Sequence, residues 1–374
     1  LCHGGVDRLA PILPPQAPDD VPKLSPLTAS ILYLEHLRDA WNHEHPDAPL
    51  EEQELTITVP ASFDPAAREL TAEAARDAGL ANMVLLEEPQ AALYAWIEGT
   101  QGAWREQVRV GDVILVVDVG GGTTDLSLMA VAERGGALEL HRVAVGEHIL
   151  LGGDNMDLAL AMAARGKLET EGKRLDAWQL SALTHGCRSA KETLFRDPAV
   201  ESVPIVVPSR GRKLVGGSIR TELTREEVET ILVLGFFPEV EASERPTTGA
   251  RAALAQLGLP YARDAGITRH LAAFLGRQLG ATDDDEGFDA RLPEGATFLH
   301  PTAILFNGGV FSSALLQERV TRQIDAWLTS EGGRPARVLE GSSLDVAVAR
   351  GAAYYGYVRR GHGVRIRGGT AQAY

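Results

Sequence analysis

The stretch LVVDVGGGTTDLSLMAV, residues 115–131, is the part of the sequence that decides the fold. Two apolar runs flank three consecutive glycines, with Asp118 just before the glycines and Asp125 just after them. Apolar runs rich in valine and leucine are typical of buried strands, and glycine permits a tight turn between them. The stretch therefore predicts two buried strands joined by a turn that carries carboxylates.

The two aspartates of this turn predict a phosphate and metal site. An unpaired carboxylate at the end of an apolar run costs free energy, so Asp118 needs a partner. Mg²⁺ fits, because it is usually held by few carboxylates together with water and phosphate oxygens. Thr123 and Asp125 would then position a phosphate or an attacking water. The turn is not a Walker loop, because no GK[ST] follows. The open alternative is that both aspartates only make hydrogen bonds within the hairpin.

Two further glycine pairs follow apolar runs, at residues 152–153 and 308–309. Glycine leaves the backbone N–H groups unshielded, and successive N–H groups can form a concavity that binds anions. Both pairs also precede predicted helices, whose N-termini favour phosphate. The alternative is that each pair only makes a tight turn.

The length, composition and charge of the chain limit the class of protein. The chain has 374 residues, of which 44% are hydrophobic, and a formal charge of −15. Such a chain can bury a core, and its acidity argues against non-specific nucleic-acid binding. Two cysteines without metal spacing favour a reducing, cytoplasmic location. No apolar run reaches the ~18 residues of a membrane span, so we expect no membrane partner. Because the first residue is Leu1, we expect an excerpt from a longer protein.

Helical and strand patterns alternate along most of the chain, which favours an α/β fold with a mixed sheet. Helix signals include Ser25 before Pro26 and Asp64 before Pro65. We also expect helix caps near Asp154 or Asn155, at Thr224 with Glu227, and at Ser343, and strands at 203–207 and 213–221. The predicted domains are a proline-rich extended lead-in (1–24), a first lobe (25–110), a second lobe with an irregular insertion at about 238–300 and a return helix (111–358), and a basic, glycine-rich tail or linker (359–374).

The motif DVGGGTTDLSLMAV resembles the second phosphate-binding motif of the ATPase superfamily that contains Hsp70, actin and sugar kinases. Within it, the Hsp70 family matches best. Six further segments resemble Hsp70 motifs in the same order, from about residue 25 to 358. They are TITVPASFDPAARELTAEAARDAGL (56–80), LLEEPQAALYAW (85–96), LLGGDNMD (150–157), CRSAKETL (187–194), LFNGGVFSS (305–313) and SLDVAVARGAA (343–353). The resemblance implies an actin-like, ribonuclease H-like fold with two lobes around a nucleotide cleft, in a divergent bacterial protein.

The resemblance also implies roles for individual residues. Glu88 would lie near the γ-phosphate, Asp118 would bind the Mg²⁺ shell through water, and Asp125 would orient water. ATP or ADP with Mg²⁺ is the implied ligand. The residues implied to contact it are Gly120, Gly121, Gly122, Thr123, Gly152, Gly153, Lys191, Gly308, Gly309 and Asp345.

The residue types alone also allow purely structural roles for three of these positions. Glu88 would then be an acid at a helix end, Lys191 a surface charge, and Asp345 a partner of a helix dipole.

Three departures from the family pattern stand out. No D-x-G-T-T-x-S stretch is present, so the first phosphate loop and the catalytic lysine after it are missing, and we expect no ATP hydrolysis by the chain alone. In the adenosine-contacting segment, Arg188, Glu192 and Phe195 replace the family's glutamate, arginine and serine, which puts the purine preference in doubt. The number of residues between Lys191 and Gly308 is also larger than the family needs, and the additional residues fall in the predicted insertion.

The sequence therefore leaves three functions open. The first is the ATP-binding domain of an Hsp70-like chaperone ATPase, which would meet unfolded clients and co-chaperones through parts outside this chain. The second is a nucleotide-gated interaction module with little turnover. The third, a small-molecule kinase of the same superfamily, is weaker because no sugar-site motif is found.

Overall fold

A computed structural model describes residues 7–14, 20–134, 136–208, 218–247, 262–281, 288, 292–341 and 343–367. Parts of the predicted lead-in, of the insertion, of the tail and of the predicted strand 213–221 lie outside these residues. None of the helices in the described ranges is both long and apolar enough to cross a membrane.

A five-stranded mixed sheet forms the centre of the larger lobe, in the order β5-β4-β3-β8-β9. The antiparallel part contains β3 (Val113–Val119), β4 (Thr124–Arg134) and β5 (Ala137–Val145). The parallel part adds β8 (Ala303–Asn307) beside β3, and then β9 (Arg337–Val338). The opening stretch of sequence is the β3–β4 hairpin, so the predicted mixed sheet and hairpin are confirmed.

Strand β3 is buried on both faces of this sheet, which explains its continuous apolar run. Successive side chains of a strand point to opposite faces. Val113 and Leu115 pack in one core cluster, whereas Ile114 and Val116 pack in the other, with helix α3 (Glu88–Gly99). By the same alternation, Asp118 points to the α3 side of the sheet.

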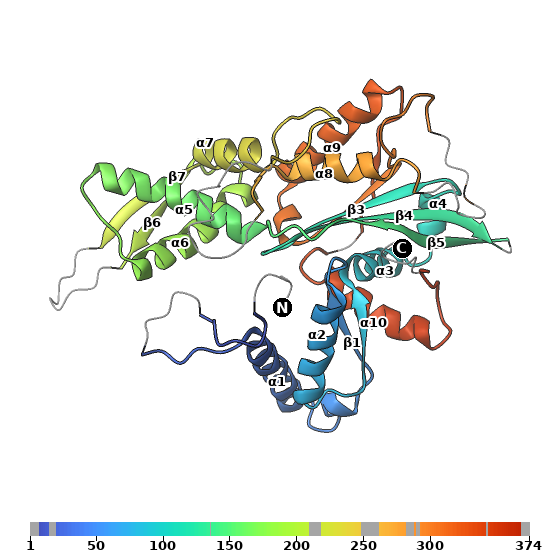
Figure 1. The fold of residues 1–374 in the computed structure, drawn as a ribbon, viewed down its shortest axis with the longest axis horizontal. Helices are drawn as coiled ribbons and strands as arrows, with labels where there is room; N and C mark the ends of the chain where they lie inside the picture. The colour runs from blue at the N-terminus through green and yellow to red at the C-terminus, as the bar shows by residue number, and fades with distance from the viewer. Residues whose placement is uncertain are drawn as a thin grey trace.

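Helices lie over the opposite face of the sheet, and a small hairpin with two further helices lies beyond the end of the sheet (Figure 1). The sheet and these elements are called the upper lobe. The elements are α5 (Gly153–Thr170), α6 (Ala177–Arg196), β6 (Ser202–Val207), β7 (Ile219–Thr224), α7 (Arg225–Val228) with its π-helical continuation (Glu229–Leu234), α8 (Ile267–Arg277), and α9 (Ala314–Ser330). Helix α8 lies inside the predicted irregular insertion, yet Leu271 and Phe274 are buried in the core.

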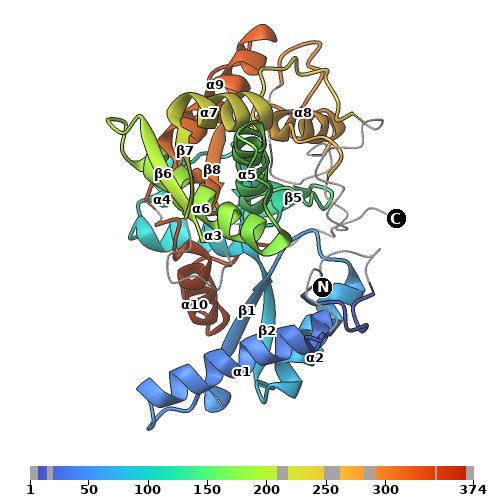
Figure 2. The same ribbon diagram turned by 90° about the vertical axis from the view of Figure 1, so that its left-hand side faces the viewer.

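The lower lobe is a β-α-β unit with one more helix (Figure 2). Strands β1 (Leu55–Val59) and β2 (Met83–Glu87) pair in parallel and are joined by α2 (Pro65–Asp77), on which α1 (Pro26–Glu44) packs. A parallel pair requires such a crossover. Among the described strands, β1 pairs only with β2, so its other edge carries no described strand.

Helices α3 and α10 (Ala347–Arg359) cross where the lobes meet. Gly351 makes the crossing possible, because a Cβ atom there would lie 1.7 Å from the carbonyl oxygen of Ala91. A buried ion pair between Glu87 of β2 and Arg142 of β5 also joins the lobes.

The first part of the predicted tail runs along the edge of the upper sheet. The N–H of Arg142 donates to the carbonyl of Arg367 at 3.0 Å, and the N–H of Arg367 donates to the carbonyl of Leu140 at 2.9 Å. Ile366 is buried beside this edge, and its N–H donates to the hydroxyl of Tyr94 at 2.9 Å. Ile366 and Arg367 therefore attach this segment to the edge of the upper sheet.

The predicted helix caps are confirmed at three helices and are wrong at two. Ser25, Asp64 and Thr224 cap α1, α2 and α7 with their side chains. Helix α5 is capped by Gly152 rather than by Asp154 or Asn155, and the Asn155 side chain instead accepts from the Gly152 N–H at 2.8 Å. Helix α10 begins at Ala347, so the predicted cap at Ser343 is wrong.

Candidate active site

The three glycine turns meet at the ends of β3 and β8. The N–H of Gly153 donates to the carbonyl of Gly120 at 2.9 Å, and the N–H of Asp154 donates to that of Gly121 at 2.7 Å. A Cβ atom on Gly152 would lie 2.6 Å from the oxygen of Gly120. Two of the turns therefore pack backbone against backbone, which only glycine allows.

The third turn lies against the end of β3 in the same way. Gly308 has a φ of +86°, and a Cβ atom there would lie 2.3 Å from the carbonyl oxygen of Val119 and 2.7 Å from Oδ1 of Asp118. Any larger residue would be strained and would also displace the aspartate. Gly308 thus brings the β8 turn beside Asp118.

The first turn presents unused backbone donors. The N–H of Gly120 donates to the carbonyl of Thr123 at 2.9 Å and closes the turn. Within the described part of the chain, the N–H groups of Gly121, Gly122 and Thr123 have no hydrogen-bond acceptor. Three successive free N–H groups form the kind of concavity that binds a phosphate.

A cavity of about 550 Å³ opens beside these turns, within the range of small-ligand pockets. Six residues predicted to contact nucleotide line it: Gly120, Gly121, Gly153, Lys191, Gly309 and Asp345. The three departures from the family pattern line it too, at Arg188, Glu192 and Phe195. The predicted residues that do not line it are Glu88, Asp118, Gly122, Thr123, Asp125, Gly152 and Gly308.

Three of these residues, the carboxylates Glu88, Asp118 and Asp125, gather on the α3 side of the sheet. Asp118 and Asp125 are directly paired in the β3–β4 register, and Glu88 is the first residue of α3. Burial, with a contribution from the Asp125 charge, raises the pKa of Asp118 to about 6, although the Nδ2 of Asn307 donates to Asp118 at 2.7 Å. Burial and the charges of Asp118 and Asp125 raise the pKa of Glu88 to about 8.

This cluster fits a cation that also contacts phosphate. Its donors are carboxylate oxygens, which Mg²⁺ prefers. Burial raises the pKa of Glu88 and of Asp118, and a bound cation would favour their ionised forms again. Nowhere in the described ranges do three or more His, Cys, Asp or Glu residues form a ready metal cage. Mg²⁺ needs no such cage, because one or two carboxylates, water and phosphate oxygens suffice.

The raised pKa of Glu88 predicts a pH-dependent stability in the nucleotide-free and metal-free protein. Between about pH 4.5 and 8 the folded chain keeps a proton that the unfolded chain releases, so stability falls as pH rises through this window. Glu88→Gln removes this loss. We expect the difference in melting temperature between the variant and the wild type to be a few degrees larger at pH 8.5 than at pH 5. Thermal unfolding at both pH values measures it. Glu133→Gln, at an exposed end of β4, is the control. An equal difference at both pH values would contradict the prediction.

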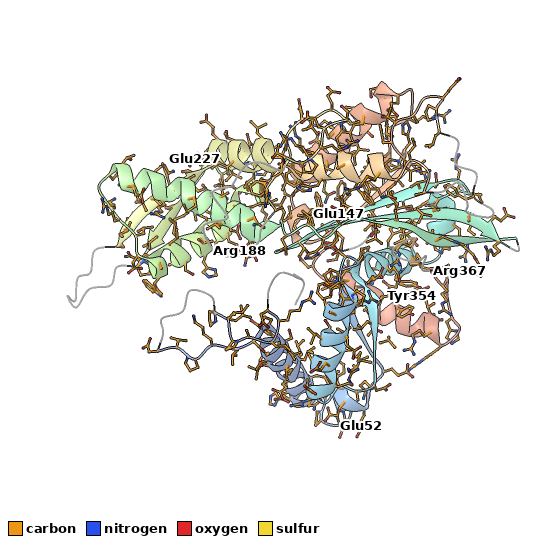
Figure 3. All side chains as sticks on the ribbon, viewed as in Figure 1. Glu52, Glu147, Arg188, Glu227, Tyr354 and Arg367 are labelled. Carbon is orange, nitrogen blue, oxygen red and sulfur yellow. The ribbon has the colours of Figure 1, made fainter. Side chains whose placement is uncertain are left out.

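Lys191 lines the cavity as a buried, paired cation rather than as an exposed surface charge. Its Nζ lies 2.6 Å from Oδ1 of Asp157, which is 2% exposed. Arg188 also pairs with Asp157, at 2.8 Å, and with Asp154. Arg188 lies on the side of the upper lobe that faces the lower lobe (Figure 3). The two cations that line the cavity are thus held by two carboxylates.

The structure adds residues that the sequence analysis missed. The Ser313 side chain lines the cavity, is 4% exposed, and its hydroxyl has no hydrogen-bond partner in the described ranges. Asn307 holds Asp118, and its position directly before the third glycine pair was the signal that could have identified it. Ser62 contacts both Asp125 and His148, and nothing in the sequence patterns indicated either contact.

Comparisons with known proteins agree with this architecture. A family model described as "Hsp70 protein" matches residues 23–242. A chaperone protein HscA homolog of Acinetobacter baylyi is 32% identical over 202 residues, which are 54% of this chain and 29% of that protein. The homolog from Burkholderia orbicola is 38% identical over 159 residues, covering 42% of this chain and 23% of that protein. The chain therefore spans less than a third of the length of these relatives.

Proposed function

The chain belongs to the Hsp70 family, and on this premise we propose that it binds ATP and, in the intact protein, supports its hydrolysis as part of a bacterial chaperone ATPase. The observation that carries the proposal is the meeting of three glycine turns above a cluster of buried carboxylates, beside a cavity of about 550 Å³. Backbone donors and carboxylates in this arrangement suit a nucleoside triphosphate with its metal.

Each part of the site would have a distinct task. The free N–H groups of residues 121–123 would hold phosphate oxygens, and Asp118 would hold the metal shell through water. When bound, Mg²⁺ supplies charge neutralisation on the phosphates. Glu88 and Asp125 would orient the attacking water toward the terminal phosphate. The aliphatic and aromatic side chains of the cavity, which include Phe195, would cover the nucleoside.

The same proposal includes the functional cycle of the whole protein. Closure of the two lobes on the nucleotide would be the moving step, and hydrolysis would reset it. Clients and co-chaperones would be engaged by parts outside this chain, in the cytoplasm. Among the described residues, the three glycine turns that would face phosphate all belong to the upper lobe. Activity is therefore tested on the intact protein.

A second candidate is a nucleotide-gated interaction module with little turnover. The pairing of Arg188 and Lys191 with Asp154 and Asp157 favours it, because both cations are already paired where the resemblance implies nucleoside contacts. A binder needs only that the cavity admit a nucleotide, whereas an ATPase also needs the carboxylate cluster below it.

Phosphate release from Mg²⁺-ATP by the intact protein separates the two candidates. The proposed ATPase predicts steady turnover that Glu88→Ala lowers by about 100-fold, with ATP still bound. Saturable binding without turnover in the wild type would favour the gated module. Absence of both would contradict the proposed function.

A further inference from the structure

A single hydroxyl joins the lower lobe to the carboxylate cluster. Ser62 lies in the loop between β1 and α2, and its Oγ donates to Oδ1 of Asp125 at 2.5 Å. The same Oγ lies 2.6 Å from Nδ1 of His148, which stands between β5 and α5. One side chain of the lower lobe therefore contacts two of the upper lobe.

The chemistry of these groups sets the direction of both hydrogen bonds. A serine hydroxyl has one proton to donate, and an ionised carboxylate can only accept. With Asp125 as a carboxylate, the proton of Ser62 points to Asp125. Ser62 must then accept its second bond, so Nδ1 of His148 carries a proton and donates it.

Asp125 depends on this contact for its orientation. It is 2% exposed, and the Oγ of Ser62 donates to its Oδ1. Asp118 lies directly opposite Asp125 in the β3–β4 register, so a second carboxylate stands beside it. A hydrogen bond from a fixed hydroxyl holds a buried carboxylate in one orientation.

We propose that Ser62 is a positioning residue that holds Asp125 for water activation, with His148 fixing the direction of the Ser62 hydroxyl. Because Ser62 belongs to the lower lobe and Asp125 and His148 to the upper one, the water-orienting carboxylate is set only when the lobes are closed. This links closure to hydrolysis through one hydrogen bond. The inference rests on the proposed function, and the experiments below separate the failure of one from the failure of the other.

Two substitutions of the serine test the hydroxyl itself. Ser62→Ala removes the donor and is expected to lower the single-turnover rate of ATP hydrolysis in the intact protein about tenfold. The dissociation constant for ATP should stay within about twofold, because Ser62 does not line the cavity. Ser62→Thr keeps the hydroxyl and should restore most of the rate, which a loss of packing alone would not explain.

Two substitutions of the histidine test the direction of the bond. The amide of His148→Asn can place an N–H near the position of Nδ1, whereas the longer side chain of His148→Gln places it near Nε2. We expect His148→Asn to keep most of the rate and His148→Gln to behave like Ser62→Ala. The double variant Ser62→Ala/His148→Gln should lose no more than either single variant, since both act through one contact.

A spectroscopic readout tests the contact without turnover. In ¹⁵N-labelled protein, the imidazole of His148 should carry its proton on Nδ1, and Ser62→Ala should change this signal. If the wild type neither binds nor hydrolyses ATP, the proposed function fails. If it hydrolyses ATP but Ser62→Ala keeps the wild-type rate, only the inference fails. An imidazole protonated on Nε2 alone in the wild type would also overturn the inference.

Discussion

Replacing Asp118 with asparagine is expected to lower the rate of ATP hydrolysis by the intact protein about 100-fold or more, without loss of folding. The side chain keeps its shape, and its remaining carbonyl oxygen can still accept from Nδ2 of Asn307, which donates to Asp118 at 2.7 Å. What is lost is the negative charge that would hold the metal shell. Phosphate release under saturating ATP measures the rate.

The same substitution should stabilise the nucleotide-free protein. Burial raises the pKa of Asp118 from 3.8 to about 6, so ionisation costs stability as pH rises through that window. At pH 8 the Asp118→Asn variant should therefore unfold at a higher temperature than the wild type. Asp77→Asn, exposed at the end of α2, removes the same charge elsewhere and should change neither property. An Asp118→Asn variant with wild-type turnover would contradict the proposed metal role.

The second large effect is structural. Gly351→Ala is expected to destabilise the protein by about 3 kcal/mol or more, because the new methyl group would fall 1.7 Å from the backbone oxygen of Ala91. The backbone of α3 cannot yield as a flexible side chain does. Helices α3 and α10 would have to separate, and this would disturb the junction of the two lobes. The midpoint of urea unfolding, with the slope unchanged, measures the effect.

Gly356, in the same helix, provides a matched control. A Cβ atom there would meet nothing within 4 Å. Gly356→Ala should therefore follow helix propensity alone and stabilise the protein by up to about 1 kcal/mol. If both substitutions had the same sign, the close crossing of α3 and α10 at Gly351 would be wrong.

Local signals predicted the parts of the fold that depend on local chemistry. The β3–β4 hairpin followed from two apolar runs around three glycines, and the caps at Ser25, Asp64 and Thr224 followed from side chains that bond within their own first turn. The start of α10 did not follow, because the helix begins at Ala347, four residues after Ser343, and packs on α3 through Gly351. A cap residue is a local preference, and tertiary packing overrode it.

The same division holds at the site. The glycine turns with Asp118 and Asp125 were predictable because each motif is continuous in sequence. The pairing of Lys191 with Asp157 was not, since the two residues lie on different helices. Nor were the contacts of Ser62 with Asp125 and His148, which join residues 63 and 86 positions apart. Only the folded chain shows that these polar groups satisfy one another.

The most direct test of the central claim, that the glycine turns and the carboxylate cluster form a nucleotide site, is a calorimetric titration of ATP into the intact protein with and without Mg²⁺. We expect one saturable site per chain, with weaker binding when Mg²⁺ is absent, since the carboxylates would then face the phosphates uncompensated. Absence of saturable binding under both conditions would contradict the claim.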